Sequence, residues 1–282
     1  MRAVVITGVS SGIGRATAQM LIARGFHVFG SVRKEGDAQR LAKELGTGFT
    51  PLVFDVTDEA GIKAAAATVR ASLGGTCLAG LVNNAGIAVA GPVQELPIAE
   101  YRRQFEINLF GPIAVTQAFA PLLGADPAMK GPRGRIVMMS SVAGRNGNPF
   151  MSAYCSSKHA LEGLSESLRR EMMAHGIDVI IIAPGAVKTP IWDKADGTDI
   201  SAFTGSPFYP AMKTTKAVME HMGATGLPPE KIAEAVYAAL TLPKPKVRYQ
   251  ITPNPMQQLM MKLLPKRMVD GVIANRLGLR KA

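Results

Sequence analysis

Residues 7–15, TGVSSGIGR, decide the fold. They follow a strand-like apolar run and precede a helical pattern, so they form a strand-to-helix turn. Glycine at positions 8, 12 and 14 lets a phosphate group reach the backbone and the helix N-terminus, where a side chain would block contact. An ordinary tight turn is the alternative. The turn predicts a dinucleotide pyrophosphate site with the contacts Gly8, Ser10, Ser11, Gly12, Ile13 and Gly14.

Short apolar runs alternate with longer helical patterns on both sides of this turn, which is typical of β-α-β units and a parallel sheet. Strands are expected at residues 3–7, 27–32, 50–54, 80–83, 135–140, 178–183 and 247–251. Helices are expected at residues 13–24, 37–45, 58–73, 98–123, 154–174 and 229–242. Right-handed crossovers place such helices on both faces. We therefore expect a single doubly wound α/β domain with a seven-stranded parallel sheet, followed by a C-terminal helical extension.

The composition restricts the class of protein. The chain has 282 residues, of which 47% are hydrophobic and 19% are charged, which excludes wholesale disorder. Its two cysteines, Cys77 and Cys155, are expected to be free thiols in a reducing compartment, with Cys155 a packing residue. The four histidines lack metal-ligand spacing, so no metal site is expected. Neither a signal segment nor a membrane-spanning run is recognised, and a cytoplasmic location is expected.

The net charge of +11 is concentrated at one end of the chain. Residues 244–282 contain nine basic residues and one acid, a net charge of +8, so the first 243 residues carry only +3. A nearly neutral body with a basic tail does not resemble a nucleic-acid-binding domain, and no basic patch is interleaved with aromatic residues. No nucleic-acid partner is therefore expected.

Two segments depart from the alternating pattern. Residues 189–226 are rich in Gly, Pro, Ser, Thr and aromatic residues, which favours a mobile flap over a site after the sixth strand. Residues 253–282 predict a basic amphipathic tail with helical patterns over 257–264 and 266–277. The favoured interpretation packs the apolar stripe on the domain 1–252 or on a partner subunit. The alternative is attachment to an anionic membrane surface.

Tyr154 and Lys158 are the candidate reacting groups. Four residues apart in a helical pattern, they share one face with Cβ atoms about 5–6 Å apart. A nearby cation lowers a tyrosine pKa by favouring phenolate, and acid–base catalysis works best near the operating pH. Such a pair alone also occurs on helix surfaces. Ser141, thirteen residues before Tyr154 at a strand end, adds a hydroxyl group to the pair.

The GxxxGxG turn, the Asn-Asn-Ala-Gly segment at residues 83–86, Ser141 and the Tyr154-x-x-x-Lys158 pair together resemble the short-chain dehydrogenase/reductase family. The resemblance is close over about the first 190 residues and looser to about residue 250. It implies a Rossmann-type domain that transfers hydride between a nicotinamide cofactor and a secondary alcohol or ketone. No substrate-specific motif is part of it.

The resemblance also implies roles for individual residues. Tyr154 donates a proton to the carbonyl oxygen in reduction and accepts one in oxidation. Lys158 depresses the tyrosine pKa and binds the nicotinamide ribose, while Ser141 hydrogen-bonds the substrate oxygen. Asn108 would hold a water that relays protons from Lys158. The further cofactor contacts are Asp55, Val56, Asn84, Ala85, Gly86, Tyr154, Lys158, Pro184, Gly185, Val187 and Thr189.

The end of the second strand bears on the choice of cofactor. An acid there holds the ribose 2′-hydroxyl of NAD, whereas arginine accommodates the 2′-phosphate of NADP. Val32 stands where NAD-preferring relatives have Asp, and Arg33 and Lys34 follow. NADP is therefore favoured, with NAD as the alternative.

Residues 154–172 look most like the 17β-hydroxysteroid and retinol dehydrogenase branch. That likeness implies an apolar, steroid-like or other cyclic substrate, and the family implies a homodimer or homotetramer. Two alternatives stay open. One is a 3-oxoacyl thioester reductase, and the other is a regulator that binds NADP(H) without chemistry.

Overall fold

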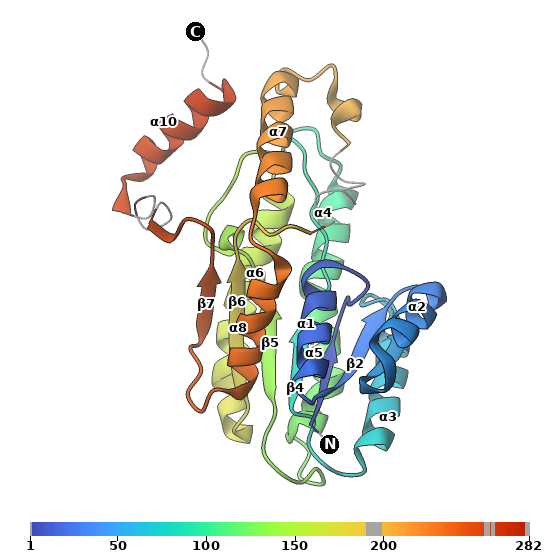
Figure 1. Ribbon diagram of the computed structural model, residues 1–282. Coiled ribbons are helices and arrows are strands. Elements are labelled where there is room, and N and C mark those ends of the chain that lie inside the picture. The colour runs from blue at the N-terminus through green and yellow to red at the C-terminus, as the bar shows by residue number, and fades with distance from the viewer. Residues whose placement is uncertain (1, 190–198, 257–259, 261–262, 280–282) are drawn as a thin grey trace.

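The computed structural model describes residues 2–189, 199–256, 260 and 263–279. Seven parallel strands form one sheet in the order β3-β2-β1-β4-β5-β6-β7 (Figure 1). They are β1 (Ala3–Ile6), β2 (His27–Val32), β3 (Phe49–Val53), β4 (Gly80–Asn83), β5 (Arg135–Met139), β6 (Asp178–Pro184) and β7 (Arg248–Ile251). The predicted doubly wound, seven-stranded parallel sheet is confirmed. The strand order reverses between β1 and β4, where such sheets bind ligands at their carboxyl edge.

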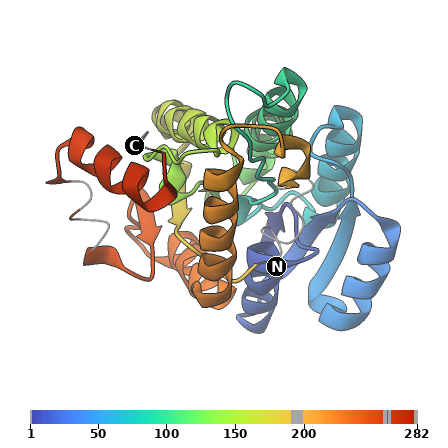
Figure 2. The ribbon, with the colours of Figure 1, turned by 90° about the horizontal axis from the view of Figure 1, so that it is seen from above.

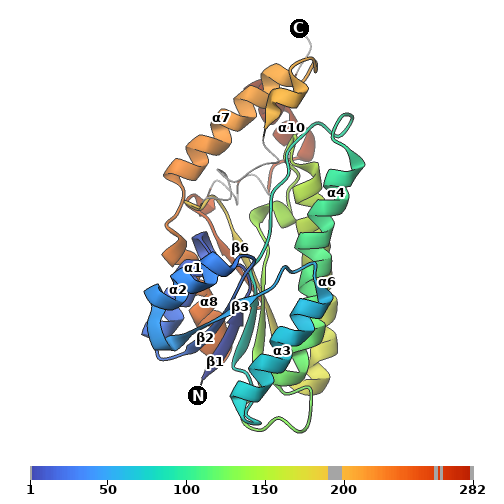
Figure 3. The same ribbon diagram turned by 90° about the vertical axis from the view of Figure 1, so that its right-hand side faces the viewer.

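Helices cover both faces of the sheet (Figure 3). Around one core pack α1 (Gly12–Ala23), α2 (Glu35–Leu45) and α8 (Pro229–Thr241). Around the other pack α3 (Glu59–Leu73), α5 (Gly111–Phe119) and α6 (Ser152–Glu171), with α4 (Ile98–Phe105) beside α6. This arrangement follows from alternating β and α segments joined by crossovers.

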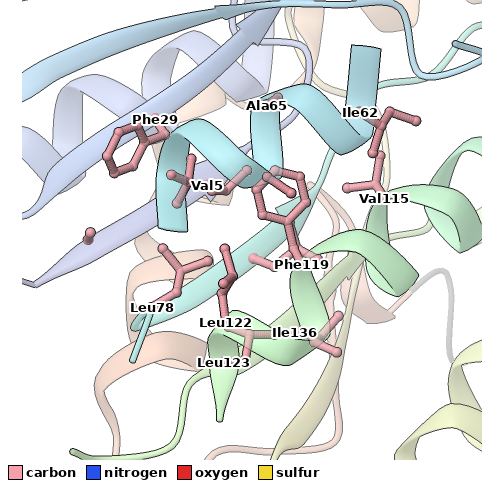
Figure 4. Packing of buried hydrophobic residues seen from close by; sticks show 14 of the residues in the cluster. Val5, Phe29, Ile62, Ala65, Leu78, Val115, Phe119, Leu122, Leu123 and Ile136 are labelled. Atoms are coloured by element: carbon pink, nitrogen blue, oxygen red, sulfur yellow. The ribbon is translucent and has the colours of Figure 1, made fainter. Parts of the chain in front are cut away.

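The strands are buried on both faces, so their consecutive residues enter different cores. Val5 lies in the core with α3 and α5, opposite Phe29 and Leu81 in the neighbouring strands. Its neighbours Val4 and Ile6 lie in the core with α1 and α8. This period of two is the geometry of an extended chain. Figure 4 shows the first core, where Val5 and Phe29 gather with residues of α3 and α5.

The predicted helix 98–123 is interrupted. A π-helical turn, Glu106–Phe110, separates α4 from α5, and a 3₁₀ turn, Ala120–Leu123, ends the segment. A π turn inserts an extra residue and re-aims the side chains around it. Here it places Asn108 at the interior, with 1% of its surface exposed. Continuous helical periodicity did not predict this insertion.

The predicted flap 189–226 contains more regular structure than expected. Within its described part, α7 (Tyr209–Thr225) is a 17-residue helix, preceded by a 3₁₀ turn, Ile200–Phe203. Pro210 lies in the first turn of α7, where a missing backbone N–H costs no helical hydrogen bond. Gly205 and Pro207 precede α7, Gly223 lies in its last turn and Gly226 ends it, so these residues do not mark one continuous loop. Residues 190–198 of the flap lie outside the described residues.

The C-terminal extension contains α10 (Lys266–Leu277), as predicted for residues 266–277. It packs beside α7 at the edge of the molecule (Figures 1 and 2). The predicted helix at 257–264 lies partly outside the described residues. Among the helices that the structure describes, none is both long and apolar enough to span a bilayer.

Candidate active site

A cavity of about 330 Å³ opens at the carboxyl edge of the sheet, above the switch between β1 and β4. It brings together nearly all of the predicted site residues. Those in its wall are Gly8, Ser10, Ser11, Gly12, Ile13, Gly14, Arg33, Asp55, Val56, Asn84, Ala85, Gly86, Ser141, Tyr154, Lys158, Pro184, Gly185, Val187 and Thr189. Two predicted residues, Lys34 and Asn108, are outside the wall. Val32, which the sequence analysis considered for cofactor choice, also lines the wall, and sequence reasoning missed Ser31, Phe54, Ile87, Ala88, Arg103, Ile107, Met139 and Ser140.

The glycine turn has the geometry that an anion site needs. Gly8 and Gly12 adopt left-handed φ values of 72° and 58°. A Cβ atom at Gly14 would lie 2.2 Å from the Gly8 carbonyl oxygen, so only glycine fits there. The first turn of α1 contains no acidic residue, which leaves the positive end of the helix dipole unopposed. The residues present therefore fit a pyrophosphate.

A hydrogen-bonded clamp joins the glycine turn to the loop after β4. The Thr7 hydroxyl accepts hydrogen bonds from the backbone N–H groups of Asn84 at 2.9 Å and Ala85 at 3.0 Å. The Asn84 Nδ2 donates to the carbonyl oxygens of Thr7 at 2.8 Å and Gly8 at 3.1 Å. Asn84 thus fixes the loop after β4 against the glycine turn, and these two segments form adjacent walls of the cavity. Thr7 was not predicted, although a threonine ending a strand before glycine could have indicated it.

The far end of the cavity, at the tip of β2, is cationic. Arg33, which directly follows Val32, is exposed and lines it. Lys34 is exposed but lies outside the lining, at the start of α2. Asp55 and Arg103 also line the cavity, and Arg103 is paired with Glu100 at 2.6 Å. Only one of the two predicted cations therefore faces the cavity.

Tyr154, Ser141 and Lys158 meet in the cavity wall. Ser141 begins the turn after β5, where its hydroxyl accepts from the Ala143 N–H at 3.1 Å and donates to the Pro184 carbonyl oxygen at 3.4 Å. The Lys158 Nζ donates to the Met139 carbonyl oxygen at 2.8 Å and lies 5.9 Å from the Tyr154 ring centre. The i to i+4 spacing on α6 thus places the cation beside the ring, as predicted.

Burial dominates the titration of this pair. It raises the pKa of Tyr154 above its usual value, and the hydrogen bond with Ser141 opposes that rise. It also lowers the pKa of Lys158 to about 8. Both shifts disfavour the charged form, as desolvation does. The family resemblance implies that the pKa of Tyr154 is lowered. In this structure, burial raises that pKa instead.

Asn108 lies behind the cavity wall and fixes the backbone that forms it. Its Oδ1 accepts from the Ile87 N–H at 2.9 Å. Its Nδ2 donates to the Ile87 carbonyl oxygen at 3.0 Å and to the Ser157 hydroxyl at 3.2 Å. A Cβ atom at Gly86 would lie 3.1 Å from Asn108 Oδ1 and 3.8 Å from Lys158 Nζ, so Gly86 separates the two.

A buried carboxylate supports the strand end that carries Ser141. The neighbouring Ser140 hydroxyl donates to Glu162 at 2.9 Å, and Glu162 also pairs with Arg145 at 3.0 Å and Arg248 at 2.9 Å. Glu162 stands four residues after Lys158 on the buried side of α6. In the sequence, Glu162 could have been recognised as an acidic residue at a position of the helix that faces the core. The sequence analysis did not identify it.

A second, smaller cavity of about 30 Å³ lies under α7. Its wall includes Ala90, Phe150, Met212 and Met219, with Lys216 and Glu220 at α7 positions four residues apart. Met219 and Tyr154 both pack against the same small apolar cluster of Ala88, Ala90, Ala143, Met151 and Cys155.

No group of three His, Cys, Asp or Glu side chains suited to a metal occurs within the described residues.

Comparison with known proteins agrees with this geometry. The family model described as short chain dehydrogenase matches residues 2–199. An NADPH-dependent 3-dehydrocapnine reductase of Ornithobacterium rhinotracheale is 38% identical, over 96% of both chains. Retinol dehydrogenase 5 of Mus musculus is 32% identical, over 96% of this chain and 87% of its own. The solved structure of a short-chain dehydrogenase from Streptomyces avermitilis is 30% identical, with a TM-score of 0.77 over 97% of this chain and 94% of its own. The matched model, the relatives and the shared fold establish that this chain belongs to the short-chain dehydrogenase/reductase family of oxidoreductases.

Proposed function

We propose that this protein is an NADP(H)-dependent oxidoreductase that interconverts a secondary alcohol and a ketone on an apolar substrate. The observation that carries the proposal is that Ser141, Tyr154 and Lys158 line the cavity that also contains the glycine turn, with Lys158 Nζ 5.9 Å from the Tyr154 ring centre. A proton donor and an anion site in one cavity are what hydride transfer to a carbonyl requires.

The glycine turn, the loop after β4 and Lys158 would hold a nicotinamide cofactor, which would supply or accept the hydride at the reacting carbon. The residues of this chain handle the proton. In reduction, the Tyr154 hydroxyl donates its proton to the carbonyl oxygen as negative charge develops there, and Ser141 donates a hydrogen bond to the same oxygen. The charged Lys158 beside the ring favours the phenolate that remains. In oxidation, the phenolate accepts the alcohol proton. Asn108, separated from Lys158 by Gly86, would hold a water that relays protons from Lys158.

Arg33 supports the preference for NADP(H). Its guanidinium lines the cavity at the tip of β2, and guanidinium groups bind phosphate by charge-assisted hydrogen bonds. The relative from Ornithobacterium is described as NADPH-dependent. NAD(H) remains the alternative cofactor, and the assay below compares both.

The apolar cavity under α7 supports an apolar substrate. Phe150, Met212 and Met219 give it an adaptable apolar wall. The names of two relatives specify 3-dehydrocapnine and retinol, and retinol dehydrogenase belongs to the branch that residues 154–172 resemble. A 3-oxoacyl thioester is the competing substrate class.

We also propose a division of the chain into a catalytic body, 1–252, with a substrate flap at 189–226, and a basic tail, 253–282. Helix α10 of the tail contacts α7 of the flap. This contact supports the interpretation of residues 253–282 as a separate segment that packs against the flap. We expect a homodimer or homotetramer, and light scattering coupled to size-exclusion chromatography measures its mass.

A hydride-transfer assay tests the proposal. Oxidation of NADPH and of NADH is followed by absorbance with three substrate groups, namely bulky apolar ketones, small polar ketones and 3-oxoacyl thioesters. We expect turnover with apolar ketones and a higher kcat/KM for NADPH. Turnover of the thioesters alone would show that the substrate is a 3-oxoacyl thioester and not an apolar ketone. Cofactor binding without turnover of any substrate would indicate a regulator.

A further inference from the structure

Among the described residues after the last strand, five large apolar side chains are exposed. Met256, Met260 and Leu263 are 69%, 59% and 77% exposed, and Met268 and Val272 on α10 are each 57% exposed. Exposed apolar residues scattered over a surface need no explanation, but a concentration in one segment indicates an interaction site. None of these five residues has a role in the proposed chemistry.

Helix α10 already buries other apolar side chains, so the exposed ones are not the residues by which it packs on the molecule. The helix lies beside α7, with Val269 and Ile273 half-buried and Leu277 buried. Met268 and Val272, four residues apart, share a different line along α10. Figures 1 and 2 show α10 at the outer edge of the molecule. The apolar stripe of Val269, Ile273 and Leu277 therefore packs on the molecule, whereas the second stripe, Met268 and Val272, remains exposed.

Exposed cations occur on the same helix. Arg276, four residues after Val272, lies beside the second stripe, and Lys266 and Arg267 are exposed in the first turn of α10, which has Asp270 as its single acid. Residues 244–282 together carry a net charge of +8. Apolar side chains among lysine and arginine match a bilayer interface, where the apolar groups enter the acyl boundary and the cations contact anionic head groups.

We propose that the exposed apolar and basic residues of α10, Lys266, Arg267, Met268, Val272 and Arg276, dock on a bilayer that contains anionic lipid, together with the exposed Met256, Met260 and Leu263 that precede the helix. A second copy of the chain fits less well. A twofold interface would place the same patch against itself and bring its cations together. Nucleic acid would satisfy the cations but leave the apolar side chains in water.

Vesicle sedimentation of the full-length protein tests the proposal. The vesicles contain either phosphatidylcholine alone or phosphatidylcholine with 30% phosphatidylglycerol. We expect at least about tenfold stronger binding to the anionic vesicles at low salt, because each basic residue near such a surface contributes about fivefold. Binding weakens as salt is added, since the attraction is screened.

Two pairs of variants separate the contribution of the basic residues from that of the apolar residues. Lys266→Glu/Arg267→Glu is compared with Lys43→Glu/Lys63→Glu, which changes net charge equally on exposed residues of α2 and α3. Met268→Ser/Val272→Ser is compared with Val93→Ser/Ile98→Ser, which are 67% and 65% exposed elsewhere. We expect each tail variant to lose at least about tenfold in vesicle affinity and each control to keep it within about threefold.

The midpoint of thermal unfolding shows that each variant is folded, and turnover of a water-soluble ketone shows that the catalytic cavity is intact. Equal binding to both kinds of vesicle, or tail variants that bind like their controls, would overturn the proposal. So would dissociation of an oligomer by the tail variants, which would identify a second copy as the occupant.

Discussion

Glu162 and Arg248 join the catalytic helix to the edge strand of the sheet. The Arg248 Nε lies 2.9 Å from one carboxylate oxygen of Glu162 and 3.1 Å from the other, although 86 residues separate them. Ser140, next to Ser141, donates to the same carboxylate. Burial alone would raise the pKa of Glu162, but the hydrogen bonds from Arg248 and Ser140 lower it below its usual value. The position of Ser141 therefore depends on a fully partnered buried carboxylate.

Removing this carboxylate is expected to destabilise the fold. Glu162→Leu leaves the Arg248 guanidinium, whose side chain is 11% exposed, without its ion pair, at a cost of about 3–5 kcal/mol. Removing both charges with Glu162→Leu/Arg248→Met is expected to cost less than the single change. Urea unfolding measures these free energies.

The surface pair of Glu59 and Lys63, both 73% exposed, provides the control. Glu59→Ala is expected to cost less than about 1 kcal/mol. A Glu162→Leu variant that is as stable as Glu59→Ala would show that the buried network contributes nothing.

The cofactor preference is expected to depend on Arg33 and not on Lys34. A charge-assisted hydrogen bond contributes about 1.5–3 kcal/mol, so Arg33→Ala is expected to raise KM for NADPH by roughly 10- to 100-fold. KM for NADH is expected to change little. Lys34→Ala is the matched control, because Lys34 lies outside the cavity wall. Equal effects of Arg33→Ala on both cofactors would contradict recognition of the 2′-phosphate.

Phe150 is expected to restrict the substrate. It has φ of 62°, packs edge-on against Phe208 and lines the cavity under α7. Phe150→Gly and Phe150→Ala both enlarge that cavity, so both are expected to raise kcat/KM for bulkier ketones relative to small ones.

The two variants differ in the backbone. Glycine adopts this φ without strain, whereas alanine keeps a strain of the order of 1 kcal/mol. The glycine variant is therefore expected to unfold at the higher temperature. A lower midpoint for Phe150→Gly than for Phe150→Ala, or unchanged substrate selectivity in both, would count against this role.

The rate of ketone reduction is expected to fall as the pH rises through about 8. Burial lowers the pKa of Lys158 to about 8, so its ammonium is charged below that pH and neutral above it. Once neutral, it no longer stabilises the Tyr154 phenolate. The pH profile of kcat/KM for NADPH, which reports groups of the free enzyme, measures this change. Lys158→Ala is expected to have a lower rate without the decline near pH 8. A wild-type rate that stays constant up to pH 9.5 would contradict the assignment.

The sequence was sufficient to predict the fold and most of the cavity. Short apolar runs and the glycine turn are local signals, so the seven strands and the part of the cavity wall from Gly8 to Gly14 could be predicted. The turn after β5 and the spacing on α6 likewise placed Ser141 and Tyr154 together.

The parts that sequence reasoning missed depend on packing between distant segments. The π turn at Asn108 has no local periodic signal, because it is fixed by hydrogen bonds to Ile87 and Ser157. Arg248 meets Glu162 only because β7 pairs with β6 at the sheet edge. The two apolar stripes of α10 could not be separated before the position of α7 was known.

The proton transfer from Tyr154 is the central claim, and the Tyr154→Phe variant tests it most directly. Phenylalanine keeps the ring and removes the proton donor. Ketone turnover and NADPH affinity are measured on the same preparation, the latter by fluorescence titration. We predict a loss of kcat by a factor of about 10²–10⁴ with the NADPH dissociation constant unchanged within about threefold. A variant that binds NADPH normally and retains more than a tenth of wild-type turnover would contradict the proposed mechanism.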